Sequence, residues 1–293
     1  MRYPFIRDHR QEYPVQMMCE ILEVSRSGFY DWLIREPSAQ QQRRAQLCAQ
    51  IKAAFQESRQ SYGSPRITRE LAGKGFVASR NTIAKIMHEQ ELCGRTPRRF
   101  VPKTTDSGHD CPIAPNRLER QFDAGTGAPA WISDITYIPT DEGWLYLAAV
   151  MDLRSRRILG WAMADHMRVE LVLDALQMAL TRRGPVKELL HHSDRGSQYA
   201  CAGYRAALAD AGIECSMSRT GNCYDNAVME SFWASLKIEE VYRRTYATGA
   251  QATTAIFNYI EIFYNRTRRH SALGYLSPEA FEAQRNGPFF SAR

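Results

Sequence analysis

The chain has 293 residues, enough for two small domains or for one core with appendages. Its hydrophobic content of 44% and charged content of 24% are those of an ordinary soluble globular protein. The first ten residues lack the apolar core of a signal peptide, and no apolar run approaches the roughly 18 residues of a membrane span, so we expect a cytoplasmic location and no membrane partner.

The net charge of +6 is unevenly distributed. Residues 1–120 carry 20 Lys and Arg against 13 Asp and Glu, whereas residues 121–293 carry 18 against 19. The excess is densest in residues 51–103, with 11 basic and 4 acidic side chains. Such density is typical of a surface that neutralises nucleic-acid phosphates, although a charge run can also be only a solvated surface.

The amino-terminal part is predicted to form two pairs of short helices. In the first pair, a helix at 15–22 and a turn at 23–26 precede a second helix at 28–33, which Ser25 or Ser27 can cap. These lengths are those of a helix-turn-helix.

The second pair is clearer. A helix at 67–72 stops at Gly73 and Gly75, and Ser79 can cap a helix at 80–88. The apolar residues of the helix at 80–88 would face inward and leave its polar face open, as in a DNA-recognition helix. Many helical hairpins that do not bind DNA share this pattern. The outward side chains, which we expect to contact DNA, are Arg80, Asn81, Lys85 and His88.

A basic linker is expected at 96–121, because four prolines and Gly108 break the periodicity there. Three arginines at its start, Arg95, Arg98 and Arg99, are further candidates for DNA contact. We therefore predict a helical DNA-binding region at 1–95, the linker at 96–121 and a second domain at 122–285.

Beyond the linker, strands alternate with helices. Closely spaced strands at 131–138, 144–152 and 157–164 predict an antiparallel meander. The elements that follow are helices at 170–182, 200–211, 226–241 and 252–266, and strands at 187–192 and 214–217. This order predicts an α/β, ribonuclease-H-like fold, a mixed sheet flanked by helices. Three aromatic side chains are expected in its core: Trp144, Tyr146 and Trp161.

Three acids stand where a metal-ion site would need them. Asp134 lies inside the first strand, Asp194 ends the apolar run that begins at Leu189, and Glu230 lies in the helix at 226–241. Mg²⁺ and Mn²⁺ prefer carboxylate and water oxygens, and acids packed together would repel one another without cations. Two ions about 4 Å apart can then assist an in-line displacement at phosphorus.

The spacing of these acids alone is weak support. With 13 Asp and 19 Glu in 293 residues, chance predicts about 0.8 Asp/Glu pairs with 35 residues between them, and the chain contains five. Only Asp194/Glu230 joins a strand end to an acid in the middle of a helix. The five pairs are Asp106/Glu142, Asp134/Glu170, Asp152/Glu188, Asp194/Glu230 and Asp225/Glu261.

The helix that contains Glu230 has a packing face and an open edge. On a helical wheel Lys237 lies beside Glu230 at that edge, where it can contact a phosphate, although a surface lysine can also be only solvated. Arg195 follows Asp194 in a turn and is a further candidate for DNA contact. His191 and His192 alternate between faces of a strand, which favours a structural role over metal ligation.

Several stretches together resemble the integrase core of bacterial insertion-sequence transposases, specifically the second-reading-frame product of the insertion sequence 3 family. They are Trp131–Tyr137, His191–Tyr199, Asp225–Phe232 and Phe263–Tyr275, together with the helical Tyr62–Arg66 region. The resemblance covers nearly the whole chain. It implies a retroviral-integrase-like fold, with Asp134, Asp194 and Glu230 as the catalytic and metal-binding triad and Lys237 as the basic residue after the Glu. We also expect Arg66, in this region, to contact DNA.

The resemblance implies cleavage at the element end, followed by attack of the freed 3′-hydroxyl on another DNA strand. It also implies that a fused first-reading-frame portion supplies a leucine zipper and another DNA-binding helix pair. No heptad run of that kind occurs in this chain. We therefore expect a metal-dependent DNA transposase that acts on element ends and target DNA, uses two Mg²⁺ or Mn²⁺ ions, and forms an oligomer on DNA.

Two other interpretations remain open. A ribonuclease-H-like nuclease would only hydrolyse and would need no separate helices to bind element ends. A DNA-binding accessory protein with an idle core would bind DNA whether or not metal is present.

Overall fold

The computed structural model describes residues 2–95, 112–118, 129–184, 188–218 and 226–285. Two compact units divide the chain, Met1–Ala53 and Ala54–Arg293. The predicted linker at 96–121 falls largely outside the described residues. The division into 1–95, 96–121 and 122–285 therefore stays a prediction. No helix in the described ranges combines the length and the apolar character that crossing a membrane requires.

The smaller unit contains three short helices around an apolar cluster. They are α1 (Arg2–His9), α2 (Val15–Ile21) and α3 (Arg26–Ile34), and α4 (Ala39–Glu57) spans the boundary between the units. The hydroxyl of Ser25 accepts a hydrogen bond from the Gly28 backbone N–H at 3.1 Å and caps α3, as the sequence predicts. The cluster consists of Ile6, Met18, Cys19 and Phe29.

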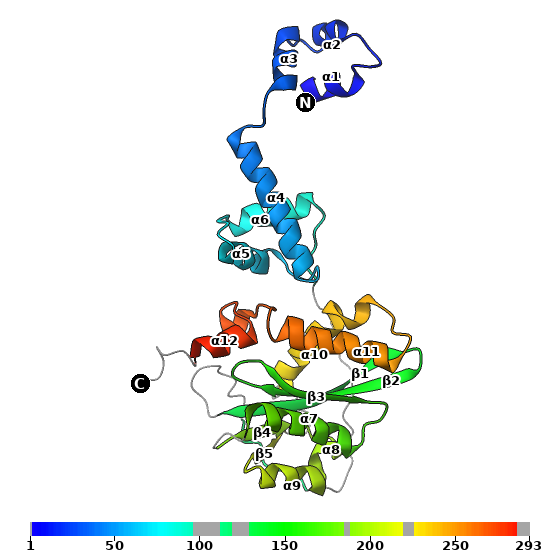
Figure 1. Cartoon of the computed structure of the whole chain (residues 1–293), viewed down its shortest axis with the longest axis vertical. Coiled ribbons are helices and arrows are strands. Elements are labelled where there is room, and N and C mark those ends of the chain that lie inside the picture. Colours follow the sequence, from blue (N-terminus) through cyan, green and yellow to red (C-terminus); the bar gives the residue numbers. More distant parts are fainter. Residues whose placement is uncertain (1, 96–111, 119–128, 185–187, 219–225, 286–293) are drawn as a thin grey trace. The chain divides into compact units, whose positions relative to one another are not determined.

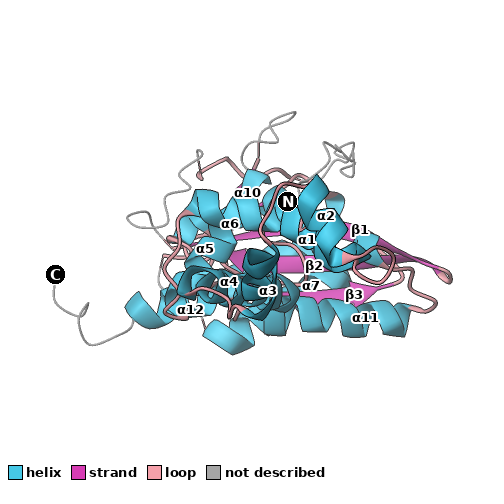
Figure 2. Ribbon diagram, turned by 90° about the horizontal axis from the view of Figure 1, so that it is seen from above, coloured by secondary structure: helices cyan, strands magenta, loops and turns pink. Residues whose placement is uncertain are grey.

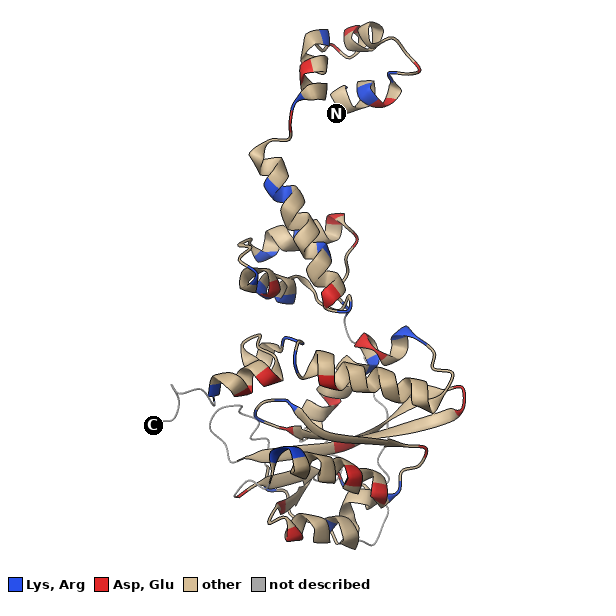
Figure 3. Cartoon of the chain, viewed as in Figure 1, with Lys and Arg blue, Asp and Glu red and all other residues tan. Residues whose placement is uncertain are grey.

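The second helix pair is confirmed as α5 (Ser64–Gly73) and α6 (Arg80–Glu89). Ser79 caps α6 by accepting a hydrogen bond from the Thr82 backbone N–H at 3.1 Å. The predicted polar residues of α6 are exposed, and Figure 3 marks basic residues on both helices of the hairpin. The apolar side chains that the two helices bury are Ile67, Leu71, Ile83, Ile86 and Met87.

The larger unit contains a five-stranded mixed sheet in the order β3-β2-β1-β4-β5. The first three strands form the predicted antiparallel meander, and β4 and β5 extend it in parallel beside β1. Figure 2 shows the meander strands running alongside one another. This topology is that of a ribonuclease-H-like fold. The strands are β1 (Ala130–Thr140), β2 (Gly143–Asp152), β3 (Ile158–Ala164), β4 (Leu190–Ser193) and β5 (Glu214–Met217).

Helices cover both faces of the sheet (Figure 1). On one face lie α7 (Val169–Arg183), α8 (Ser197–Ala200) and α9 (Ala202–Asp210); on the other lie α10 (Ala227–Glu239), α11 (Gly249–Phe257) and the π-helix η3 (Asn258–Tyr264). The predicted helix at 200–211 is interrupted at Cys201, where the backbone is extended. The predicted helix at 252–266 changes from α to π geometry at Asn258.

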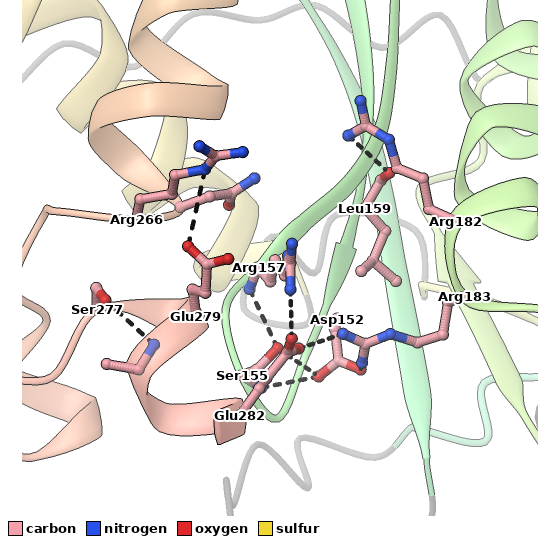
Figure 4. Close-up of polar contacts among 12 residues, drawn as sticks. Asp152, Ser155, Arg157, Leu159, Arg182, Arg183, Arg266, Ser277, Glu279 and Glu282 are labelled. Atoms are coloured by element: carbon pink, nitrogen blue, oxygen red, sulfur yellow. Dashed lines mark hydrogen bonds and ion pairs between the residues drawn. The ribbon is translucent and has the colours of Figure 1, made fainter. Parts of the chain in front are cut away.

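The carboxyl-terminal elements are tied to the sheet by polar contacts. The Asn265 side chain pairs with the backbone of Ile158 on β3, accepting one hydrogen bond and donating another, both at 3.0 Å. Glu282 of α12 (Pro278–Arg285) pairs with Arg157 and Arg183, and Arg183 also pairs with Asp152 at the end of β2 (Figure 4). These contacts hold α12 against the turn between β2 and β3 and against α7.

Candidate active site

Asp134 lies in the middle of β1, opposite Ala149 of β2, with its side chain partly buried. One carboxylate oxygen accepts the Ile135 backbone N–H at 2.8 Å. The other accepts the indole N–H of Trp233 at 2.9 Å. Because Trp233 belongs to α10, this hydrogen bond ties the helix directly to the strand residue.

Asp194 immediately follows β4, the strand that pairs in parallel with the start of β1. Its Oδ1 accepts the backbone N–H of Gly196 at 2.9 Å, which closes a tight local turn. A Cβ at Gly196 would lie 3.1 Å from this same oxygen, so the glycine leaves room for the carboxylate. The chain after β4 thus holds Asp194 at the strand end.

Glu230 lies on α10 one turn before Trp233, so both side chains project from neighbouring positions of the helix. The opposite face of α10 is packed as the sequence predicts, with Met229, Phe232 and Leu236 buried. Glu230 itself is exposed at the helix surface. The hydrogen bond from Trp233 to Asp134 therefore holds the helix against β1, with Glu230 on the side of the helix that faces Asp134.

The three acids share one electrostatic environment. Burial and, less strongly, the charges of Asp194 and Glu230 together raise the pKa of Asp134 to about 7, although the hydrogen bonds from Trp233 and Ile135 lower it. Partial burial also raises the pKa of Glu230. Burial disfavours the charged form of both carboxyls, neighbouring acids add to the effect only at Asp134, and a nearby cation would favour the charged forms.

The three carboxylates do not yet form a closed set of ligands. Across the described ranges, no group of three His, Cys, Asp or Glu side chains is close enough to hold a metal ion. Asp134 and Asp194 are fixed by hydrogen bonds to their own backbone neighbours, whereas Glu230 is exposed. Assignment of the three acids to one metal site stays a prediction.

Lys237 differs from its expected open position. It is only 8% exposed, and its Nζ lies 4.7 Å from the centre of the Tyr137 ring. Burial lowers its pKa, and the charge of Asp134 opposes that effect. Lys237 therefore lies on the Asp134 side of α10, one turn after Trp233. Its contact with a DNA phosphate stays a prediction.

The other predicted DNA contacts fall into three groups. Arg80, Asn81 and Lys85 on α6 are exposed, as is Arg95. Arg195 and Arg66 are partly buried: the Arg195 Nε donates to the Ser218 carbonyl at 2.6 Å, and Arg66 lies 4.0 Å from Glu239. Arg98 and Arg99 lie outside the described residues. DNA contact by these side chains also stays a prediction.

The two histidines before Asp194 are fully buried. His191 shares hydrogen bonds with Ser133 at 2.7 Å and with Tyr204 at 3.0 Å, and burial lowers its pKa to about 3. His192 contacts Ser216 of β5 at 2.9 Å. A neutral ring held between strands is a packing element, in agreement with the predicted structural role.

Two aromatic residues near the acids have functions that the sequence patterns do not reveal. The sequence patterns assign Trp233 no such role, although its position three residues after Glu230 is the signal that could have placed it beside the acids. The hydroxyl of Tyr199 is buried, has no hydrogen-bond partner among the described residues, and has a raised pKa because of burial and, less strongly, because of Tyr204, Asp134 and Asp194. Its hydroxyl proton is therefore held close to two of the acids.

Trp144 is not a core residue. Its side chain is 54% exposed at the start of β2, where it contacts the Tyr137 ring edge-on at a centroid distance of 4.8 Å. Trp161 is buried as predicted, and Tyr146 is partly buried.

Comparisons with known proteins agree with this geometry. Residues 129–223 and 211–278 match two models described as Integrase core domain, and residues 41–100 match a model described as HTH-like domain. The chain is 44% identical over 284 residues to the transposase InsF for insertion sequence IS3A of Escherichia coli K12, covering 96% of this chain and 98% of that protein.

The chain belongs to the insertion sequence 3 family of transposases. It is a DNA transposase with an integrase core, a polynucleotidyl transferase by family. An uncharacterized 31 kDa protein of insertion element IS600 from Shigella sonnei is 45% identical and covers 90% of this chain and 97% of its own length. Among solved structures, a simian T-cell lymphotropic virus intasome chain aligns with 78% of this chain and 73% of its own, at 14% identity and a TM-score of 0.46.

Proposed function

We propose that Asp134, Asp194 and Glu230 are the catalytic acids of this transposase and that they hold two divalent cations, Mg²⁺ or Mn²⁺. The observation that carries the proposal is the 2.9 Å hydrogen bond from Trp233 to Asp134. It brings the helix of Glu230 against the strand of Asp134, while the parallel pairing of β4 with β1 brings Asp194 to the same region. These contacts place the three acids on neighbouring elements of the fold, which supports the proposal.

The donor set fits hard divalent cations. All three side chains are carboxylates, and the pKa of Asp134 is raised by burial and by the neighbouring charge of Asp194, effects that a bound cation would oppose. Glu230, which is exposed, would complete the ligand set by moving toward the strand acids. Divalent cations in such a site activate an attacking oxygen and stabilise a leaving oxygen at phosphorus.

The protein's own part in the reaction is mainly positioning. The backbone N–H groups of Ile135 and Gly196 and the indole of Trp233 hold the carboxylates of Asp134 and Asp194 in fixed orientations. No serine or cysteine takes part as a nucleophile in this proposal. Water and then the 3′-hydroxyl of the cut strand are the attacking groups.

DNA recognition is proposed for the α5–α6 hairpin. The exposed Arg80, Asn81 and Lys85 of α6 can reach phosphates and base edges of the element ends. An oligomer on DNA would bring two ends and the target together. A fused first-reading-frame portion would supply the remaining contacts with the ends.

The first prediction concerns the triad. Replacing Asp194 with Asn in the full chain keeps the size of the side chain but removes a charged ligand, so we expect cleavage at a DNA end with Mg²⁺ to fall by about 10³-fold or more. The measurement is gel analysis of labelled DNA that carries the element end, with the first-reading-frame product supplied. Asp210→Asn, at an exposed acid at the end of α9, should keep full activity.

Other outcomes would favour the other interpretations. Cleavage without joined products would indicate a nuclease that only hydrolyses. Cleavage unchanged by Asp194→Asn would reject the triad. No cleavage by the unaltered chain, with DNA binding that ignores metal and tolerates Glu230→Gln, would favour an accessory DNA-binding protein.

A further inference from the structure

A buried network of charged and aromatic side chains joins the α5–α6 hairpin to the carboxyl end of α10. Glu239, the last residue of α10, is 5% exposed and accepts hydrogen bonds from Arg268 through both carboxylate oxygens, at 2.7 and 2.8 Å. Tyr259 donates a further hydrogen bond at 2.8 Å, and Arg66 of α5 approaches to 4.0 Å. The two-pronged guanidinium contact fixes the orientation of Glu239 as well as its position.

The loop before α5 is held at the same place. Glu240 is 1% exposed and pairs with Arg59 at 2.5 Å, and the Arg59 guanidinium lies 5.1 Å from the centre of the Phe263 ring. Arg59 and Gln60 both have a φ of 55°, which is uncommon for two consecutive residues other than glycine. Arg243 donates to the Arg59 carbonyl and to the Gln60 side chain. The contacts around α10 therefore define the shape of this loop.

A third contact lies at the rim of the network. The backbone N–H of Arg269 donates to the Tyr62 hydroxyl at 2.7 Å, and its Nε pairs with Glu70 of α5 at 2.6 Å. The side chains of this ion pair are 25% and 22% exposed. In the basic run 266–270, Arg268 thus binds α10 and the adjacent Arg269 binds the hairpin.

The network links DNA-binding and catalytic elements mechanically. Glu239 follows Glu230 by nine residues on one helix, about 13 Å along its axis, so the two ends of α10 move together. The α5–α6 hairpin carries the exposed residues of α6 and is packed as one unit through its buried apolar side chains. A shift of the hairpin would therefore displace α10 and Glu230.

We propose that the Glu239–Arg268 and Glu70–Arg269 ion pairs are positioning contacts, through which DNA bound on α6 places Glu230 and thereby raises the affinity of the active site for divalent cations. Without DNA, Glu230 is exposed and the three acids do not form a complete ligand set. Binding of DNA would bring Glu230 to the other two acids. The inference rests on the proposed function, because it assigns Glu230 to the metal site.

The test measures Mn²⁺ binding to the full chain by calorimetry, with and without a short duplex DNA. For the unaltered chain we expect duplex to raise Mn²⁺ affinity by about fivefold or more, within the usual range of coupling between sites. Arg269→Glu should abolish this gain while leaving the affinity without DNA within about twofold. The double variant Arg269→Glu, Glu70→Arg should restore it, because the ion pair is re-formed with its charges exchanged.

The matched control is Arg183→Glu. It removes an ion pair of similar burial, with Glu282, that does not involve the hairpin, so the effect of DNA should remain. Should Arg269→Glu unfold the chain, as seen by circular dichroism, the milder Glu70→Gln provides the same comparison. A DNA effect that persists in these variants, or that is absent from the unaltered chain, would overturn the proposal.

Failure of the proposed function would look different. If Mn²⁺ binding persists unchanged in both Asp134→Asn and Glu230→Gln, the metal site itself is wrongly assigned. Binding that depends on these acids but ignores DNA would reject only the coupling.

Discussion

Asp134 illustrates how one residue responds to its surroundings in the fold. A solvated aspartate has an ordinary pKa of 3.8, and burial beside Asp194 and Glu230 raises that of Asp134 to about 7. The Trp233 indole opposes this shift by donating to the carboxylate. The residue is thus poised between a neutral and a charged form near neutral pH, where a bound cation would favour the charged form.

This shift predicts a pH dependence of folding stability. The folded chain binds a proton at Asp134 more tightly than the unfolded chain, so the contribution is full below about pH 4 and is lost as pH rises through about 7. Without metal, we expect the free energy of unfolding to fall from pH 5 to pH 8 by roughly 2 kcal/mol more than in Asp134→Asn. Urea unfolding in the presence of a chelator measures the difference.

Trp233→Phe provides the comparison for this pH dependence. It removes the hydrogen bond that lowers the pKa of Asp134, so the pH window of the stability loss should move upward. Identical pH profiles for the unaltered chain and Asp134→Asn would contradict the assignment of the shift to this carboxyl group.

At the scale of elements, close backbone approach determines how α7 packs on the sheet. Gly160 lies in β3 directly beneath this helix, and a Cβ there would lie 2.0 Å from the Ala175 carbonyl oxygen and 2.6 Å from the Ala179 nitrogen. Such distances leave no room for any side chain. Leu171, Leu176 and other apolar residues of α7 complete the core at this contact.

Gly160→Ala should therefore force α7 away from β3. Overpacking of this kind costs about 1–3 kcal/mol or more, since both neighbours are backbone atoms that cannot rotate aside. Urea unfolding at constant pH measures the loss. Gly203→Ala, in α9 where an added Cβ meets nothing within 4 Å, should change stability by no more than about 1 kcal/mol. Equal effects at the two positions would contradict this account.

At the scale of the whole molecule, the charge distribution separates two uses of arginine and lysine. In Figure 3 basic residues recur along the amino-terminal helices as well as among the elements around the sheet. Those on α6 are exposed, whereas Arg66, Arg268 and Arg269 pair with acids inside the larger unit. Net charge alone does not distinguish basic residues on an exposed surface from those in internal ion pairs.

This distinction predicts the salt dependence of DNA binding. Arg80→Ala and Lys85→Ala each remove one exposed phosphate partner, so each should lower the slope of log affinity against log salt concentration by about one. Fluorescence anisotropy with a duplex over a series of salt concentrations gives the slope. Arg205→Ala, an exposed arginine on α9, serves as the control and should leave the slope unchanged. If neither variant changes the slope, the α5–α6 hairpin does not contact DNA phosphates.

Most secondary structure followed from local patterns. The capped helices α3 and α6, the three-strand meander and the packed face of α10 have strong periodicity or capping residues, and they are confirmed. No pattern in our sequence analysis predicts α1 or α4. The first half of α4 is polar, beginning Ala-Gln-Gln-Gln-Arg-Arg, so no apolar stripe marks it, although Ile51, Ala54 and Phe55 are buried.

The sequence by itself determined the family and the order of strands and helices along the chain, and it predicts the three acids, because motif residues, strand alternation and turns are local properties. Only the tertiary structure decided that Trp233 holds Asp134, that Lys237 and Arg66 lie inward, that Trp144 is exposed, and that Arg268 and Arg269 join the hairpin to α10. Each of these depends on which surfaces meet, and contacts between residues far apart in the chain leave no local signature in it.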